Sequence, residues 1–110
     1  MHVAITEHSG VTVINIKGDI DINNSPEMKK FFDQVVREKR DKVLINLELV
    51  DYVDSSGLAT LVEIYKKLRV YGGKLKLAKL SLKVKGLFEI TKLNKLFDIV
   101  ETESELYNFS

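Results

Sequence analysis

The segment Val43-Leu44-Ile45-Asn46-Leu47 constrains the fold of this chain more than any other. It is almost continuously apolar, which is typical of a central strand covered on both faces, as in the parallel sheets of α/β proteins. A helical pattern follows it, and a second strand pattern comes at Lys74 to Ala78. The helix carries its apolar positions at Leu58, Leu61, Val62, Tyr65 and Leu68. We therefore expect a strand, a crossover helix and a parallel strand, which is the basic unit of an α/β fold.

The N-terminal patterns extend this unit into a mixed sheet with helices packed on it. Strand patterns at His2 to Glu7 and at Val11 to Lys17 flank the turn residues His8-Ser9-Gly10, which predicts a β-hairpin. Ser25 before Pro26 predicts a helix start, with Ser25 as the cap residue. That helix is expected to bury an apolar stripe of Met28, Phe31, Phe32, Val35 and Val36.

The C-terminal third predicts two short helices and one more strand. Gly72-Gly73 is expected to end the crossover helix in a left-handed conformation. Ser81 can cap a shorter helix whose apolar residues are Leu82, Leu87 and Ile90. A last short strand is expected at Leu96 to Val100, before a terminal helix around Leu106 and Tyr107 that starts with a capping box of Thr102 and Glu105. We find no repeat or linker, and expect one domain over residues 1–110.

Composition excludes several classes of protein. The chain has no cysteine, which rules out disulfides, thiolate metal sites and cysteine nucleophiles. No apolar run approaches membrane-spanning length and the N-terminus lacks the order of a signal peptide, so we expect a cytoplasmic protein without membrane contact. Residues 64–95 hold ten basic residues and one acidic residue. Most of these lysines alternate with apolar residues, as on solvated faces, so we do not expect direct nucleic-acid binding.

The segment Asp51-Tyr52-Val53-Asp54-Ser55-Ser56-Gly57-Leu58 places two hydroxyls and a glycine between the end of the central strand and the start of the following helix. The first backbone N–H groups of a helix lack intrahelical partners and carry partial positive charge, so a phosphoserine is favoured there. We interpret the serine pair as a regulatory phosphorylation switch. The loop from Gly18 to Ser25 follows another strand, and we expect both loops to form one patch at the carboxyl edge of the sheet.

Structural roles compete with functional ones at each of these positions. Ser55 or Asp54 can cap the helix, and Gly57 can serve close backbone packing or leave room for a partner. Asp19 and Asp21 can form turns or contact a partner.

An enzyme using Ser55 or Ser56 as a nucleophile would need a general base, and the only histidines, His2 and His8, lie in or beside the first strand without a supporting motif. The Gly-Xaa-Ser-Xaa-Gly and Walker patterns are absent, and Asp51 with Asp54 supplies only two oxygen ligands for a divalent metal. We therefore expect no catalysis, no metal and no cofactor.

The run Val50 to Leu58, with Gly18-Asp19-Ile20-Asp21 upstream and Gly72-Gly73-Lys74-Leu75 downstream, resembles the STAS domain family over essentially the whole chain, specifically the bacterial anti-sigma factor antagonists. The resemblance implies a small α/β domain with a mixed sheet of four to five strands and about four helices. It implies phosphorylation of Ser56, with Ser55 as second choice, by an anti-sigma factor that is a serine kinase. The partner-binding residues that it implies are Asp19, Asp21, Asn23, Asn24, Asp54, Ser55, Ser56 and Gly57.

In the mechanism implied by this resemblance, the unphosphorylated antagonist binds the kinase and frees a sigma factor. Phosphorylation weakens the binding, and a serine phosphatase restores it. The protein is expected to be a monomer. A second possibility implied by the family is a ligand- or nucleotide-binding sensor or scaffold module. The antagonist role is favoured because the chain begins at Met1 and shows neither a membrane span nor a sensor domain.

Overall fold

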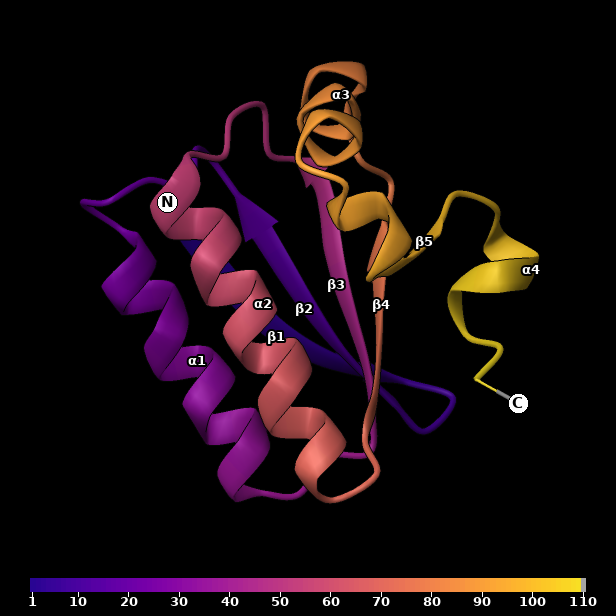
Figure 1. The fold of residues 1–110 in the computed structure, drawn as a ribbon. Coiled ribbons are helices and arrows are strands. Elements are labelled where there is room, and N and C mark those ends of the chain that lie inside the picture. Colours follow the sequence, from indigo (N-terminus) through magenta and orange to yellow (C-terminus); the bar gives the residue numbers. More distant parts are fainter. Residues whose placement is uncertain (110) are drawn as a thin grey trace.

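A mixed five-stranded sheet forms the centre of the computed structural model, which describes residues 1–109 (Figure 1). The strands lie in the order of the chain, and only the first pair is antiparallel, while the other pairs are parallel. They are β1 (His2–His8), β2 (Val11–Lys17), β3 (Lys42–Leu49), β4 (Lys74–Ala78) and β5 (Asp98–Val100). The predicted α/β class and mixed sheet are therefore confirmed.

Two long helices, α1 (Ser25–Arg37) and α2 (Ser55–Val70), run side by side over one face of the sheet (Figure 1). The predicted stripe of α1 is confirmed for Met28, Phe32 and Val35, which are buried in the core, whereas Phe31 and Val36 are only half-buried. Two shorter helices, α3 (Leu82–Ile90) and α4 (Glu103–Leu106), follow with a 3-10 turn, η1 (Leu93–Lys95), between them. In the described residues no helix is long and apolar enough to cross a membrane.

The central strand β3 is buried on both faces, as its apolar run predicts. Ile45 and Leu47 point into the large core under α1 and α2, whereas Leu44 belongs to a second cluster on the opposite face. In that second cluster, Leu106 and Phe109 of the C-terminal segment cover the sheet. Alternate side chains of a strand face opposite sides, so a covered strand needs apolar residues at nearly every position.

Element ends confirm several predictions. Gly72 has a φ of +81° directly after α2, which is the left-handed ending expected there. The Ser81 side chain accepts a hydrogen bond from the backbone N–H of Val84 and caps α3. Thr102 and Glu105 form the predicted capping box of α4.

Two expectations about these ends are wrong, the cap of α1 and the start of the last strand. Ser25 is not the cap of α1: the cap position belongs to Asn24, because the Ser25 N–H already bonds to the carbonyl of Asp21 and the helix starts at Ser25 itself. The short helix predicted through Leu82, Leu87 and Ile90 is present as α3; its buried residues are Val84 and Phe88, while Leu82 and Ile90 are exposed. The last strand starts at Asp98, two residues later than expected, because η1 and its turn take up the preceding residues.

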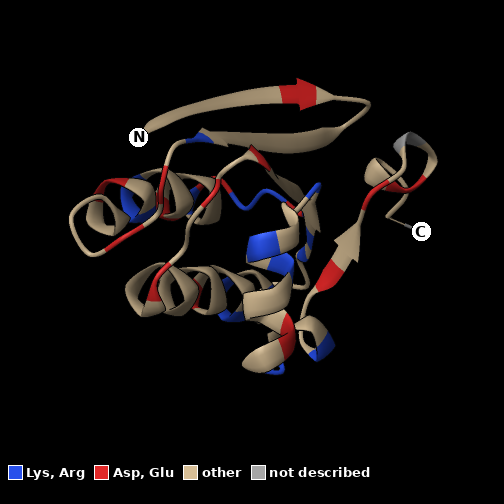
Figure 2. Cartoon of the chain, turned by 90° about the horizontal axis from the view of Figure 1, so that it is seen from above, with Lys and Arg blue, Asp and Glu red and all other residues tan. Residues whose placement is uncertain are grey.

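The basic residues do not gather on one face. Figure 2 shows Lys and Arg distributed over helices and strands, with Asp and Glu between them and in the loops. Lys76 on β4 differs from the other basic residues because it is buried. Its Nζ donates to the carbonyl of Glu105 at 2.8 Å. This pattern is that of solvated faces, as the alternation of lysines with apolar residues predicts.

Candidate functional site

The loops after β2 and β3 are joined into one surface at the carboxyl edge of the sheet. The Ile20 N–H donates to the carbonyl of Tyr52 at 2.8 Å, and the Asp54 N–H donates to the carbonyl of Ile20 at 3.0 Å. These bonds form a parallel bridge between Ile20 and Val53 beyond the ends of the two strands. The predicted proximity of the two loops is therefore confirmed.

Asp54 is the cap residue of α2, and its carboxylate serves both loops. One oxygen, Oδ1, accepts from the N–H of Gly57 at 3.0 Å, which is the usual bond of a cap residue to the third helical position. The other oxygen, Oδ2, accepts from the N–H of Ile22 in the first loop at 3.0 Å. Of the two cap candidates that the sequence leaves open, the structure therefore selects Asp54 over Ser55.

Ser55 and Ser56 occupy the first turn of α2 with unbonded hydroxyls. Ser55 is exposed and Ser56 is half-buried. Within the described residues neither Oγ has a hydrogen-bond partner, and the only side-chain bond to this pair comes from Thr60 Oγ1 to the Ser56 carbonyl. Because Asp54 already caps the helix, both hydroxyls are available for modification.

Gly57 allows α2 to start in close contact with the bridge between the loops. A Cβ atom added at this position would lie 2.6 Å from Cγ2 of Ile20 and 2.8 Å from Cγ1 of Val53. Such distances are far inside van der Waals contact, so only glycine fits here without movement of the neighbours. Close packing is thus one role of this residue, and its contact with a partner stays a prediction.

The four candidate residues of the first loop divide into two pairs. Asp21 and Asn24 form the turn: Asp21 Oδ1 accepts from the N–H groups of Asn23 and Asn24, and Asn24 Oδ1 accepts from the N–H of Asp21. The side chains of Asp19 and Asn23 are exposed and make no side-chain hydrogen bond with the described residues. Asp21 is therefore a turn former, while Asp19 and Asn23 can face a partner.

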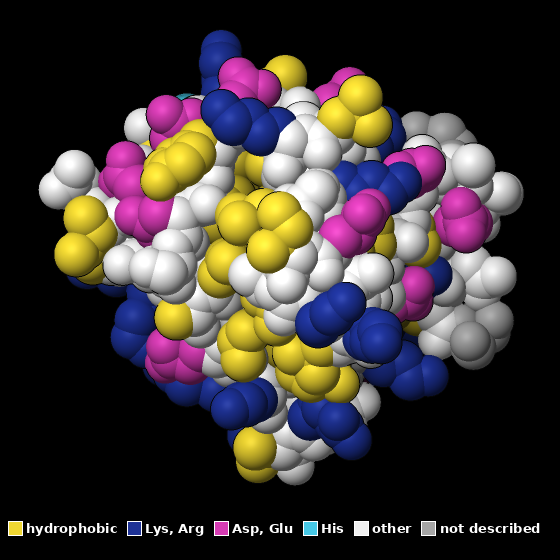
Figure 3. All heavy atoms as spheres, turned by 45° about the horizontal axis from the view of Figure 1, so that its top comes forward, with side chains coloured by type: hydrophobic (Ala, Val, Ile, Leu, Met, Phe, Trp, Pro, Cys, Tyr) yellow, Lys and Arg dark blue, Asp and Glu magenta, His cyan; other side chains and the backbone are white. Residues whose placement is uncertain are grey.

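An apolar groove of about 660 Å³ lies between the serine loop and α3, and sequence reasoning misses it. Leu58, Val84 and Leu87 contribute to its lining, together with exposed Tyr52, Leu82 and Ile90. Leu82 is 89% exposed and Ile90 is 80% exposed. In Figure 3 hydrophobic side chains gather in the middle of this face, with charged residues around them. The available signal was that the segment Leu82 to Ile90 carries apolar residues on every side, more than one buried face requires.

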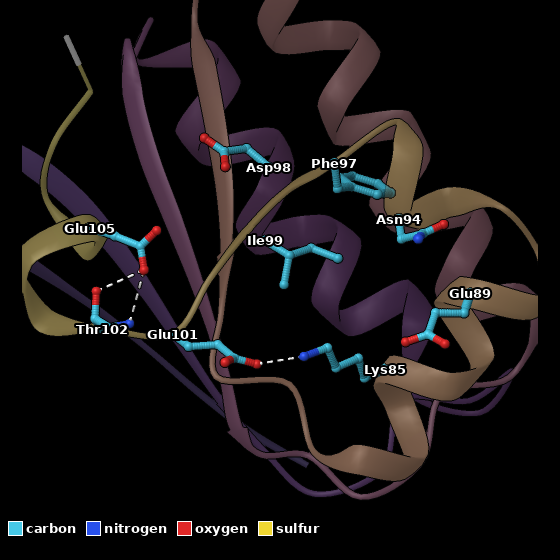
Figure 4. A pocket seen from close by; sticks show the side chains of 9 residues that line it. All are labelled: Lys85, Glu89, Asn94, Phe97, Asp98, Ile99, Glu101, Thr102 and Glu105. Carbon is cyan, nitrogen blue, oxygen red and sulfur yellow. Dashed lines mark hydrogen bonds and ion pairs between the residues drawn. The ribbon is translucent and has the colours of Figure 1, made fainter.

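A second hollow of about 530 Å³ lies between α3, η1 and β5, and none of the candidate residues lines it (Figure 4). Its charges are largely matched inside the chain. The Glu101 carboxylate bonds to Lys85 at 2.9 Å and raises the pKa of that amine. Hydrogen bonds from the side chain and backbone of Thr102 lower the pKa of Glu105. Among the described residues, no three His, Cys, Asp or Glu side chains gather as a metal site would require.

Comparisons with known proteins agree with this geometry. The family model described as the STAS domain matches residues 2–106. The chain is 32% identical over 99 residues to the anti-sigma-B factor antagonist of Bacillus subtilis, with 90% of each chain covered. It is 33% identical over 95 residues to the anti-sigma-B factor antagonist of Listeria monocytogenes, covering 84% of this chain and 82% of the relative.

The fold has close solved counterparts. A crystal structure of an anti-sigma factor antagonist from Mycobacterium paratuberculosis superposes with a TM-score of 0.86 at 25% identity, covering 96% of this chain and 89% of the other. The match of the family model to nearly the whole chain, together with these relatives, shows that the chain belongs to the STAS domain family.

Proposed function

We propose that this protein is an anti-sigma factor antagonist that is switched by phosphorylation of Ser56. The unphosphorylated form binds an anti-sigma factor serine kinase and releases the sigma factor, and the phosphate weakens this binding. One observation carries the proposal: the serine pair has unbonded hydroxyls on a surface that two joined loops and an apolar groove build together. The antagonists named among the relatives support it.

The start of α2 accommodates a phosphate without loss of the fold. Phosphorylation adds about 1.5 to 2 negative charges and three acceptor oxygens. The helix dipole favours such a charge at a helix N-terminus by roughly 0.3–1 kcal/mol. Ser56 lies in the first turn, and its hydroxyl supports no other part of the structure. The switch therefore acts at the binding surface and does not unfold the domain.

The same phosphate is costly when a partner covers it. It would stand two residues from Asp54 and next to Ser55, both of which line the apolar groove, so a docked partner would have to desolvate it without pairing it fully. Each 1.4 kcal/mol lost in this way weakens binding about tenfold. A loss of a few kcal/mol in binding free energy would therefore suffice to release the partner from the phosphorylated protein.

The remaining parts of the proposal follow from this role. Asp19, Asn23, Asp54, Ser55 and Ser56 face the partner. Asp21 and Asn24 shape the first loop, and Gly57 lets α2 start in close contact with the bridge between the loops. A serine phosphatase restores the binding form, and the protein acts in the cytoplasm as a monomer, by binding rather than catalysis and without nucleic acid. Residues 1–110 act as one domain. The comparisons do not favour the alternative of a ligand- or nucleotide-binding sensor or scaffold.

The direct test is intact-mass analysis with fragmentation after incubation with ATP and the anti-sigma kinases of the same genome. We expect one added phosphoryl group on Ser56, retained in Ser55→Ala and lost in Ser56→Ala. No addition with any kinase that is active on its own control substrate would contradict the proposed switch.

Binding measurements test the consequence. Ser56→Ala should hold the kinase constitutively in the presence of ATP, whereas Ser56→Asp should bind at least tenfold more weakly, which corresponds to about 1.4 kcal/mol. Titration calorimetry with the purified kinase measures both values. If both variants bound like the unphosphorylated wild type, Ser56 would not be the switch.

A further inference from the structure

The tip of the first loop, Ile22 and Asn23, is exposed and is bonded to Asp54, the residue before the serine pair. Ile22 is 68% exposed, and Asn23 is exposed as well. Bonds between Asp21 and Asn24 give the tip its internal shape. They do not fix where the tip stands relative to α2, since both partners belong to the same loop.

The backbone bridge between the loops stops short of this tip. It joins Ile20 to Tyr52 and Asp54, two residues before Ile22. Beyond that point, the bond from the Ile22 N–H to Asp54 Oδ2 is the only hydrogen bond between the two loops among the described residues. A single side chain therefore spans from the helix start to the tip.

The second oxygen of Asp54 is not needed for capping. Oδ1 alone accepts from the N–H of Gly57. Serine, threonine and asparagine are also good cap residues, but each offers only one side-chain oxygen, whereas an ionised carboxylate offers two. Two N–H groups from separate segments converge on this side chain, and the carboxylate gives each of them an oxygen of its own.

We propose that Asp54 is a positioning residue that holds the Ile22–Asn23 tip at a fixed place beside the serine pair, so that the kinase meets both loops as one preformed surface. This inference rests on the proposed function and assigns Oδ2 of Asp54 a task separate from helix capping. A loop tip that is already ordered loses less conformational freedom when the partner binds, which favours the complex.

Asp54→Ser separates the two tasks. The serine oxygen can still cap α2 at Gly57, but it leaves the Ile22 N–H without an acceptor. Amide hydrogen exchange followed by NMR should show at least tenfold faster exchange at Ile22 with little change at Gly57. Affinity for the kinase that phosphorylates the wild type should fall at least fivefold. Ser81→Thr, which keeps a hydroxyl cap on α3, serves as the matched control and should change neither value.

Each outcome decides the proposal. Unchanged exchange at Ile22, or faster exchange with unchanged kinase affinity, would overturn it. If Asp54→Ser does not fold, Asp54→Asn takes its place, because its amide nitrogen cannot accept from the Ile22 N–H. If neither folds, the carboxylate is required for folding and the positioning role is wrong. If the wild type binds no kinase, the proposed function fails, while the exchange at Ile22 still tests the link between the loops.

Discussion

At the scale of single residues, Gly57 is the position of the candidate surface with the least room for a side chain. Gly57→Ala would place a methyl group against Ile20 and Val53, and the Ile20 carbonyl lies only 3.0 Å from the same position. Overpacking of this kind costs about 1–3 kcal/mol, and we expect that loss in the free energy of unfolding measured with urea.

Gly86 is the matched control for this substitution. It also lies inside a helix, but a Cβ added there meets nothing within 4 Å. Gly86→Ala should therefore raise stability by about 0.5–1 kcal/mol, because alanine replaces a flexible residue in a helix. Equal effects of the two substitutions would show that contact with Ile20 and Val53 does not limit position 57.

Residue roles could be predicted from the sequence only where one short motif decides them. The capping serine of α3 and the Thr102–Glu105 box are local motifs, and both are confirmed. Asp54 and Ser55 are adjacent and both suit a cap, so the choice depended on the Ile22 N–H, which lies 32 positions away. Ser25 failed as a cap because the turn made by Asp21 takes its N–H. Contacts between distant segments leave no local signal.

At the scale of elements, α3 offers more apolar surface than the core uses. We expect Ile90→Ser to weaken kinase binding about tenfold or more, because burying an isoleucine side chain in an interface contributes about 1.5–3 kcal/mol. Its effect on stability should stay within about 0.5 kcal/mol, since the residue is exposed. Val70→Ser is the control, because Val70 is 86% exposed at the far end of α2. Equal binding losses at both positions would contradict a role of the groove.

The pair α1 and α2 is joined by a network of four charges, namely Lys29, Asp33, Glu63 and Lys67. Lys29 first and Lys67 second lower the pKa of Glu63, and Glu63 in turn raises the pKa of Lys67. Because the folded state depresses the pKa of Glu63, its contribution to stability is present above the ordinary value of 4.5 and is lost as the pH falls through the depressed pKa.

Glu63→Gln should therefore reduce the free energy of unfolding at neutral pH by roughly 0.2–1 kcal/mol, a small value because these side chains are partly exposed. The difference from wild type should shrink at an acidic pH below 4.5, where this carboxylate takes up a proton in the unfolded chain before it does so in the folded one. Urea unfolding at both pH values measures it, with Glu89→Gln on α3 as a control. A difference that stays constant with pH would exclude the network as its source.

Whether a segment forms a helix or a strand could be predicted from the sequence, because the spacing of apolar residues is a local property. The strand Val43 to Leu47 and the stripe of α1 are both where the pattern puts them. The groove was missed because its walls come from α3 and from the loop before α2, which the chain separates by a whole helix and a strand. The outward position of Leu82 and Ile90 likewise depends on how α3 packs, through Val84 and Phe88.

At the scale of the whole molecule, the C-terminal segment completes the core on the sheet face opposite α1 and α2. Phe109 is buried there, its carbonyl accepts from Lys74, and its ring lies 5.1 Å from the Lys76 ammonium. Phe109→Ala should cost about 3 kcal/mol, as for other large-to-small changes in a core, and should leave phosphorylation of Ser56 intact. Thermal unfolding measures the loss, and a change below about 0.5 kcal/mol would mean that the segment is not part of the core.

The bridge between Ile20 and Val53 has a consequence for how such chains can change length. Between the bond that joins Gly18 to Leu49 and the bond that joins Ile20 to Tyr52, the first loop advances by two residues and the second by three, so the second loop carries one extra residue. The two loops therefore reach the bridge from segments of unequal length. A residue added before the bridge can be taken up as a bulge, whereas one added at the bridge would shift the pairing of Ile20 with Val53 and turn a buried side chain outward.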